Sequence, residues 1–167
     1  MCDVSTISKI SEDTNLSGLD IPTKSVDKEF DREIKTGYLN LLNSSNINSY
    51  KYYKTLNKKF ENEVGDFLKN VTINPRLYSN DIRHQYVSAI YARNLGAEKA
   101  KWLGNFNERV SIGSGSGLYD SKIDKINNEI GIMYAQKYPN ISRNELLEIL
   151  WRDYPKTFEY SRMKIKN

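Results

Sequence analysis

The fold is decided by residues 80–96, which read NDIRHQYVSAIYARNLG. In the helix that this segment predicts, apolar side chains cover most of the circumference instead of one stripe. A helix of that kind needs neighbours on nearly every side, so it belongs in the middle of a bundle. Ser79 or Asn80 can cap its first turn, and Gly96 is suited to end it. The apolar positions are Ile82, Tyr86, Val87, Ala89, Ile90, Tyr91, Ala92 and Leu95.

Apolar residues at helical spacing predict further helices on both sides of this central one. No segment shows the sustained period-two alternation of strands joined by hairpin turns. The sequence therefore predicts an all-α fold, a compact bundle of about six helices. The other five are expected over residues 26–42, 50–68, 97–110 and 121–138 and from Ser142 onward, with a break near residues 43–46.

Local signals predict where these helices begin. Ser121 with Asp124, and Ser142 with Glu145, have the spacing of capping boxes, in which two side chains satisfy backbone N–H groups reciprocally. Asn74-Pro75 is expected to interrupt the helical pattern before the central helix. The Gly- and Ser-rich residues 111–117 predict a flexible connector and do not match a nucleophile elbow or a phosphate-binding loop.

Length and composition bound the domain organisation and the function. The chain has 167 residues, enough for one domain, which we assign to residues 25–167. Its 25 Lys and Arg against 21 Asp and Glu give a net charge of +4, too mild an excess to indicate nucleic-acid binding. One Cys and one His exclude a disulfide framework and the usual Cys/His zinc sites, and no cofactor is expected. No stretch approaches the roughly 20 apolar residues of a transmembrane helix.

Residues 1–24 are rich in Ser, Thr and Asp, which is typical of a flexible tail or tether. Cys2 follows the initiator Met directly. If Met1 replaces a removed signal peptide, Cys2 would be the acylated first residue of a bacterial lipoprotein and the protein's attachment to a membrane. The alternative is a natural cytosolic start with an inert thiol.

Three predicted helices carry polar side chains beside apolar faces. Such groups are destabilising when buried unless they are paired, so their positions are informative. Glu108 is expected near a helix C-terminus, where the helix dipole raises the pKa of a carboxyl group. Gly131 permits close backbone approach along the stripe that begins at Asp124. We expect one shared pocket formed by Asn80, Arg83, His84, Asn107, Glu108, Asp124, Asn127 and Asn128.

Two interpretations of these residues remain open. In the catalytic one, His84 is a general base and Glu108 a general acid, while Asp124, Asn127 and Asn128 orient groups or stabilise charge, as in a small hydrolase. In the structural one, His84 is a satisfied core histidine, Asp124 a helix cap and the two Asn residues a hydrogen-bond network between helices. Arg83 would then form a buried ion pair with Glu108 or Asp124.

Two narrower alternatives use the same carboxylates. Glu108 with Asp120 or Asp124 has the gross layout of helical muramidases that act with two carboxylates. Metal binding through His84, Glu108 and Asp124 would suit Mg²⁺ or Ca²⁺ better than zinc, although no metal is assigned.

The motifs Asn80-x-x-Arg83-His84, Asn107-Glu108 and Asp124-x-x-Asn127-Asn128-x-x-Gly131 resemble those of an uncharacterised bacterial domain family. That family occurs at the ends of polymorphic-toxin-like and secreted proteins, and as small exported or lipoprotein-like proteins. The resemblance covers roughly Asn80 to Tyr138. This chain departs from it at Asn107, where the family usually has His, and at Tyr86-Val87, where Trp is common.

The resemblance implies a bacterial protein of the cell envelope or periplasm, used in conflict between bacteria or with phage or plasmids. We expect it to bind and block an envelope or invader protein. The alternative is a toxin-like hydrolase with a cell-wall or lipid substrate. Asn107 in place of His favours binding, whereas the convergence of His84, Glu108 and Asp124 favours catalysis. A cytoplasmic location is the alternative if Cys2 is not acylated.

Overall fold

The structure is a computed structural model that describes residues 47–113 and 118–167. These residues form a compact all-α bundle of five helices, which confirms the predicted fold class. The helix expected over residues 26–42, the tail and Cys2 lie outside the described residues. The five helices are α3 (Ile47–Val71), α4 (Pro75–Leu95), α5 (Ala97–Gly113), α6 (Leu118–Lys137) and α7 (Arg143–Lys166).

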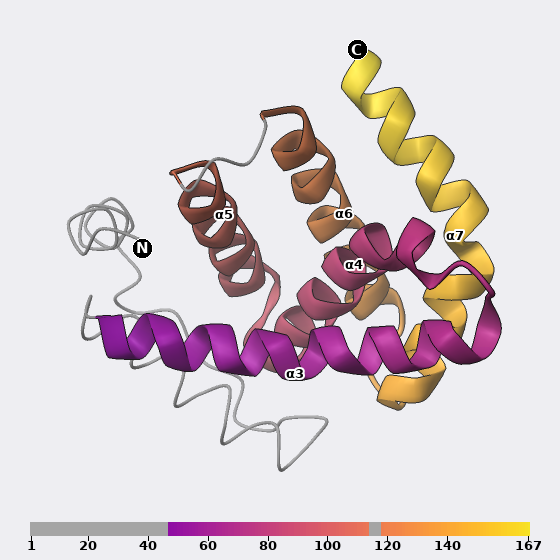
Figure 1. Cartoon of the computed structure of the whole chain (residues 1–167), viewed down its shortest axis with the longest axis horizontal. Helices are drawn as coiled ribbons and strands as arrows, with labels where there is room; N and C mark the ends of the chain where they lie inside the picture. The colour runs from indigo at the N-terminus through magenta and orange to yellow at the C-terminus, as the bar shows by residue number, and fades with distance from the viewer. Residues whose placement is uncertain (1–46, 114–117) are drawn as a thin grey trace.

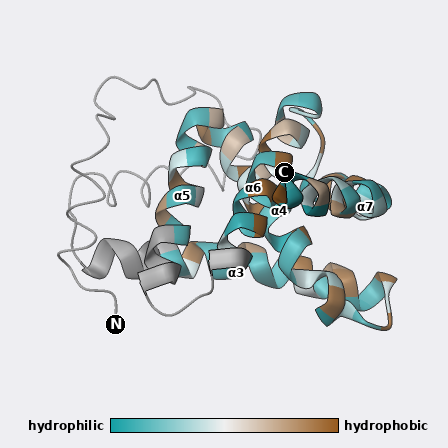
Figure 2. Cartoon of the chain, turned by 90° about the horizontal axis from the view of Figure 1, so that it is seen from above, coloured by the Kyte–Doolittle hydropathy of each residue, from teal (hydrophilic) through white to brown (hydrophobic). Residues whose placement is uncertain are grey.

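The central position expected for residues 80–96 is confirmed, because α4 packs against each of the other four helices. In Figure 1, α3 runs beneath α5 and α6, and α7 lies on the side of α4 away from α5. Ile82, Tyr86 and Ile90 of α4 have no exposed surface. Figure 2 shows hydrophilic and hydrophobic residues alternating along the helices. None of the helices in the described ranges has the length and apolar character needed to cross a bilayer.

The predicted start of the central helix is wrong. α4 begins at Pro75, more than one turn before Ser79 and Asn80. Proline is accepted at the first helical position, since that residue's N–H has no partner within the helix in any case. Asn74 precedes the helix without a side-chain capping bond. Asn80 is therefore not a cap, and its side chain is available to bond with other helices.

One predicted capping box is present and the other is absent. Ser142 Oγ accepts from the backbone N–H of Glu145 at 3.2 Å, and Glu145 Oε2 accepts from the N–H of Ser142 at 2.8 Å. α6 begins at Leu118, so Ser121 and Asp124 lie inside the helix and form no box. α5 also extends further than predicted, to Gly113, and residues 114–117 of the expected connector lie outside the described residues.

Gly131 sets the distance between α4 and α6. A Cβ atom added to Gly131 would overlap the carbonyl oxygen of Gln85 and lie 2.8 Å from its carbonyl carbon. The close approach expected at Gly131 is thus confirmed. It brings the polar side chains of α6 within hydrogen-bond reach of those on α4.

Candidate functional site

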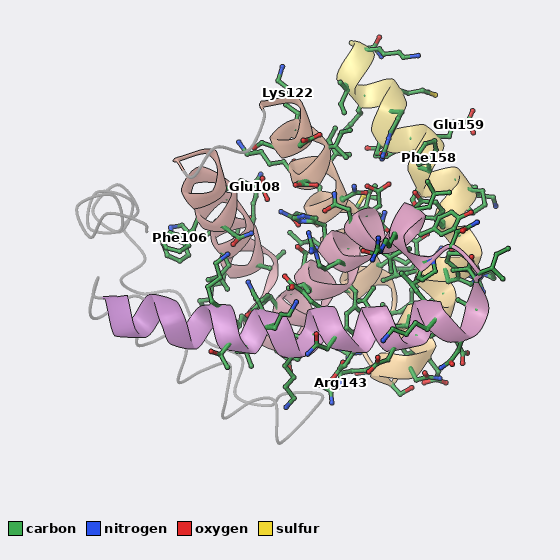
Figure 3. All side chains as sticks on the ribbon, viewed as in Figure 1. Phe106, Glu108, Lys122, Arg143, Phe158 and Glu159 are labelled. Atoms are coloured by element: carbon green, nitrogen blue, oxygen red, sulfur yellow. The ribbon has the colours of Figure 1, made fainter. Side chains whose placement is uncertain are left out.

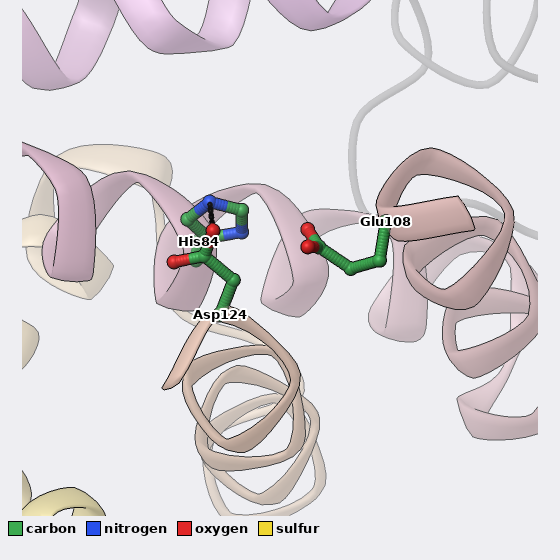
Figure 4. A group of neighbouring side chains, drawn as sticks. All are labelled: His84, Glu108 and Asp124. Carbon is green, nitrogen blue, oxygen red and sulfur yellow. Dashed lines mark ion pairs between the residues drawn. The ribbon is translucent and has the colours of Figure 1, made fainter. Parts of the chain in front are cut away.

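The structure brings together His84 of α4, Glu108 of α5 and Asp124 of α6 (Figure 4). One nitrogen or oxygen atom from each lies within 4.8 Å of the other two. His84 Nε2 is 3.3 Å from Asp124 Oδ2, and these side chains are only 12% and 15% exposed. Glu108 is 2% exposed and lies on the side of α5 that faces α6 (Figure 3). We refer to these three residues as the triad.

Hydrogen bonds with Asn128 and Asn80 hold two members of the triad, His84 and Asp124, in fixed orientations. Asn128 Oδ1 lies 3.1 Å from His84 Nδ1 and also accepts from Ser88 Oγ at 2.9 Å. Because an amide oxygen is only an acceptor, Nδ1 carries the hydrogen of this bond. In the neutral imidazole, Nε2 is then unprotonated and faces the carboxylates. Asn80 Nδ2 donates to Asp124 Oδ1 at 2.8 Å, which leaves Oδ2 directed to His84.

Arg83 does not form the ion pair with Glu108 or Asp124 that the structural interpretation expected. Its Nη2 donates to Asn80 Oδ1 at 2.8 Å, and its Nε lies 4.0 Å from Glu61 Oε1. Arg83 therefore acts on Asp124 through Asn80 and through its positive charge, without direct contact. The sequence analysis missed Glu61, which lies on α3, because its position on a strongly charged helix does not distinguish it from solvated neighbours.

The pKa values of the two carboxyl groups of the triad are shifted in opposite directions. Burial raises the pKa of Glu108, and the negative charge of Asp124 raises it further. The predicted direction is confirmed but its cause is corrected, because α5 continues to Gly113 and Glu108 is not in the last turn. Burial alone would raise the pKa of Asp124. The hydrogen bond and charge that His84 supplies in its protonated form, together with the hydrogen bond of Asn80 and the charge of Arg83, outweigh burial and hold this pKa below its usual value.

A small cavity of about 40 Å³ adjoins His84, the member of the triad that lines it. His84, Ser88, Asn107 and Asn128 are among the residues that line it. Asn107 Oδ1 is buried and has no hydrogen-bond donor among the described residues. A buried amide oxygen without a protein donor indicates a place for a water molecule or a ligand group.

Asn127 lies outside the triad and its surroundings, contrary to the expectation of one shared pocket. It is fully buried, donates to Asp81 Oδ1 at 2.9 Å and accepts from Gln85 Nε2 at 2.9 Å. Asp81 Oδ2 also accepts from Tyr154 and Arg162 of α7, at 2.9 Å and 2.8 Å. This second network ties α4, α6 and α7 together.

Comparisons with protein-family models, with curated proteins and with solved structures find no match for this chain. Its function is argued from the triad and its surroundings.

Proposed function

We propose that the chain is a small hydrolase whose active centre is the triad. The observation that supports it is the convergence of one imidazole and two carboxyl groups from three different helices. Helix surfaces rarely place such groups together in a buried position without a chemical use, because burial destabilises them. His84 also lines a cavity large enough for a water molecule.

Hydrolysis needs a water molecule whose proton is withdrawn as its oxygen attacks the substrate, and a proton for the leaving group. Each residue of the triad has a side chain that can accept or donate a proton. One nitrogen or oxygen atom from each lies within 4.8 Å of the other two. Asn80 and Asn128 hold Asp124 and His84 in fixed orientations. A water molecule among these groups would be positioned before the substrate arrives, which removes orientational freedom from the reaction.

The setting that we propose is the bacterial cell envelope, with a cell-wall or lipid substrate. The resemblance of the motifs around His84 and Asp124 to those of exported and toxin-like proteins supports this setting.

Expression with and without an export signal tests the proposal. Exported wild-type protein should inhibit growth, and H84A and E108Q should each lower the activity at least 100-fold, the usual scale for loss of an acid or base. D120N is the matched control, because Asp120, the other carboxylate of the muramidase alternative, is exposed one turn before Asp124 on α6 and is not part of the triad. Circular dichroism melting curves establish that each variant folds. Full activity in both H84A and E108Q would exclude the hydrolase.

The second candidate is a non-catalytic protein that binds and blocks an envelope or invader protein. It is supported by aliphatic side chains at the α3–α4 turn, where Ile73 is 95%, Leu77 71% and Val71 40% exposed. Clustered exposed apolar residues are typical of docking surfaces. For this function, I73S together with L77S should abolish protection against phage or plasmid entry, and H84A should leave it intact.

A further inference from the structure

The triad has the composition of a metal site as well as that of an acid–base centre. It supplies one imidazole nitrogen and two carboxylates, from α4, α5 and α6. This differs from the Mg²⁺ or Ca²⁺ that the sequence favoured for the same residues. An imidazole nitrogen brought together with two carboxylates suits first-row divalent ions such as Mn²⁺ or Zn²⁺, whereas Ca²⁺ takes six to eight oxygen ligands. Three protein ligands leave positions in the coordination sphere for water.

Each member of the triad is also held by a neighbour that would not contact the ion. His84 Nδ1 donates to Asn128, Asp124 Oδ1 accepts from Asn80, and Glu108 has a hydrogen bond with Ser121. Histidine ligands nearly always donate their second ring N–H to such a partner, which directs the other nitrogen at the metal. In His84 this arrangement directs Nε2 at the carboxylates.

The carboxylates of the triad have only partial charge compensation, because Lys125 and Arg83 act on Glu108 and Asp124, respectively, without direct contact. No Lys or Arg within the described ranges forms an ion pair with Glu108 or Asp124, and Arg83 bonds to Asn80 instead. Two carboxylates removed from water repel each other and are destabilising unless a positive charge offsets them. A divalent cation would supply that charge at the point where both carboxylates and Nε2 converge.

An independent observation comes from the cavity beside the triad. Asn107 Oδ1 lines it, is buried and has no donor among the described residues. A water molecule on a metal ion at the triad would be a strong donor and would fit a cavity of about 40 Å³. A hydrated ion bound through His84 would thus give this acceptor a donor.

We propose that His84 Nε2, Glu108 and Asp124 bind a divalent first-row metal ion, with a bound water directed to Asn107. The inference deepens the proposed hydrolase by naming its cofactor, and it rests on that function only for the ion's role in holding the attacking water. Binding itself is measured directly and does not require catalysis.

Mn²⁺ is the probe, added to the full chain after chelation and dialysis. The paramagnetic signal of free Mn²⁺ should fall with a stoichiometry of one ion per chain. H84A, E108Q and D124N should each weaken binding at least tenfold, and D120N should not change it. N128A should weaken it about tenfold, the usual effect of removing a partner that orients a ligand.

Spin-echo spectra of bound Mn²⁺ should contain coupling to a coordinated ¹⁴N nucleus, which H84A removes. Absence of Mn²⁺ binding at millimolar concentration, or equal binding by the three triad variants and D120N, would overturn the site. Metal binding by a chain without hydrolytic activity would leave the site standing and exclude the hydrolase. Full activity after chelation, with no Mn²⁺ bound, would exclude the metal site and leave the hydrolase standing.

Discussion

Asn127 and Asn128 are consecutive on α6 but bond to different partners on α4. Asn127 contacts Asp81 and Gln85, whereas Asn128 contacts His84 and Ser88. The first pair of contacts belongs to the network that joins three helices, and the second orients a member of the triad.

Substitution of each Asn by Ala should separate these roles. N127A and N128A should each lower the free energy of unfolding by about 2 kcal/mol, because both leave buried polar partners unsatisfied. Only N128A should also weaken Mn²⁺ binding. Urea unfolding and Mn²⁺ titration of the two variants provide the comparison. Equal loss of metal affinity in both would contradict the assignment of Asn127 to the structural network.

D81A tests the network that the sequence analysis did not find. Asp81 is 5% exposed and accepts from Asn127, Tyr154 and Arg162, so its removal leaves three donors without their acceptor. We expect a loss of about 3 kcal/mol, the lower end for breaking a buried ion pair, because Arg162 is partly exposed.

E129A is the control for D81A. Glu129 of α6 pairs with Lys164 of α7, two of the three helices that the Asp81 network joins, but both side chains are half exposed. Exposed ion pairs contribute little, so the change should stay within about 0.5 kcal/mol. A similar effect of both substitutions in urea would mean that the Asp81 network does not hold α7 in place.

Substitution of Gly131 by Ala tests the packing of α4 against α6, and the same substitution at Gly65 of α3 is its control. G131A places a methyl group against the backbone of Gln85, which cannot move as a flexible side chain would. We expect a loss of about 3 kcal/mol in thermal unfolding. G65A meets open space within α3 and should stabilise the chain by roughly 0.5 to 1 kcal/mol, because alanine favours the helix. Equal melting temperatures would disprove the close contact.

The capping box of α7 gives a pH-dependent prediction. The hydrogen bonds with Ser142 lower the pKa of Glu145 in the folded state. A carboxyl group with a lowered folded pKa stabilises the fold above its unfolded pKa, and this contribution is lost as the pH falls through its folded value. S142A should cost about 1 kcal/mol at neutral pH. S142A keeps the backbone N–H that bonds to Glu145, so the pH dependence is tested by E145Q, which has no titrating group at this position. The urea midpoint of E145Q should fall less on acidification than that of the wild type, and parallel decreases would argue against the box.

The helical periodicity of the sequence was sufficient to predict the all-α bundle and the central place of α4. It failed at Pro75, because the same Asn-Pro pair either interrupts a helix or begins one, and contacts made elsewhere decide which. The expected box at Ser121 and Asp124 failed for a related reason. Asp124 bonds to Asn80 and His84 on α4, and these contacts depend on how α4 and α6 cross.

The triad was predictable because each helix carried one conspicuous polar break in an apolar face. The different roles of Asn127 and Asn128 could not be predicted. Consecutive residues point about 100° apart on a helix, and only the line of contact between α4 and α6 decides which of them faces His84. Asp81 gave no signal beyond its neighbour Asn80, and its partner Arg162 lies 81 positions further along the chain.

The distribution of the triad over three helices makes ion capture inseparable from folding. Short peptides from this chain would each hold a single ligand, so neither fragments nor the unfolded chain would retain the metal. If the protein crosses a membrane as an unfolded chain, it would arrive in the new compartment without a bound ion. It would then acquire whichever divalent metal prevails in the compartment where it folds.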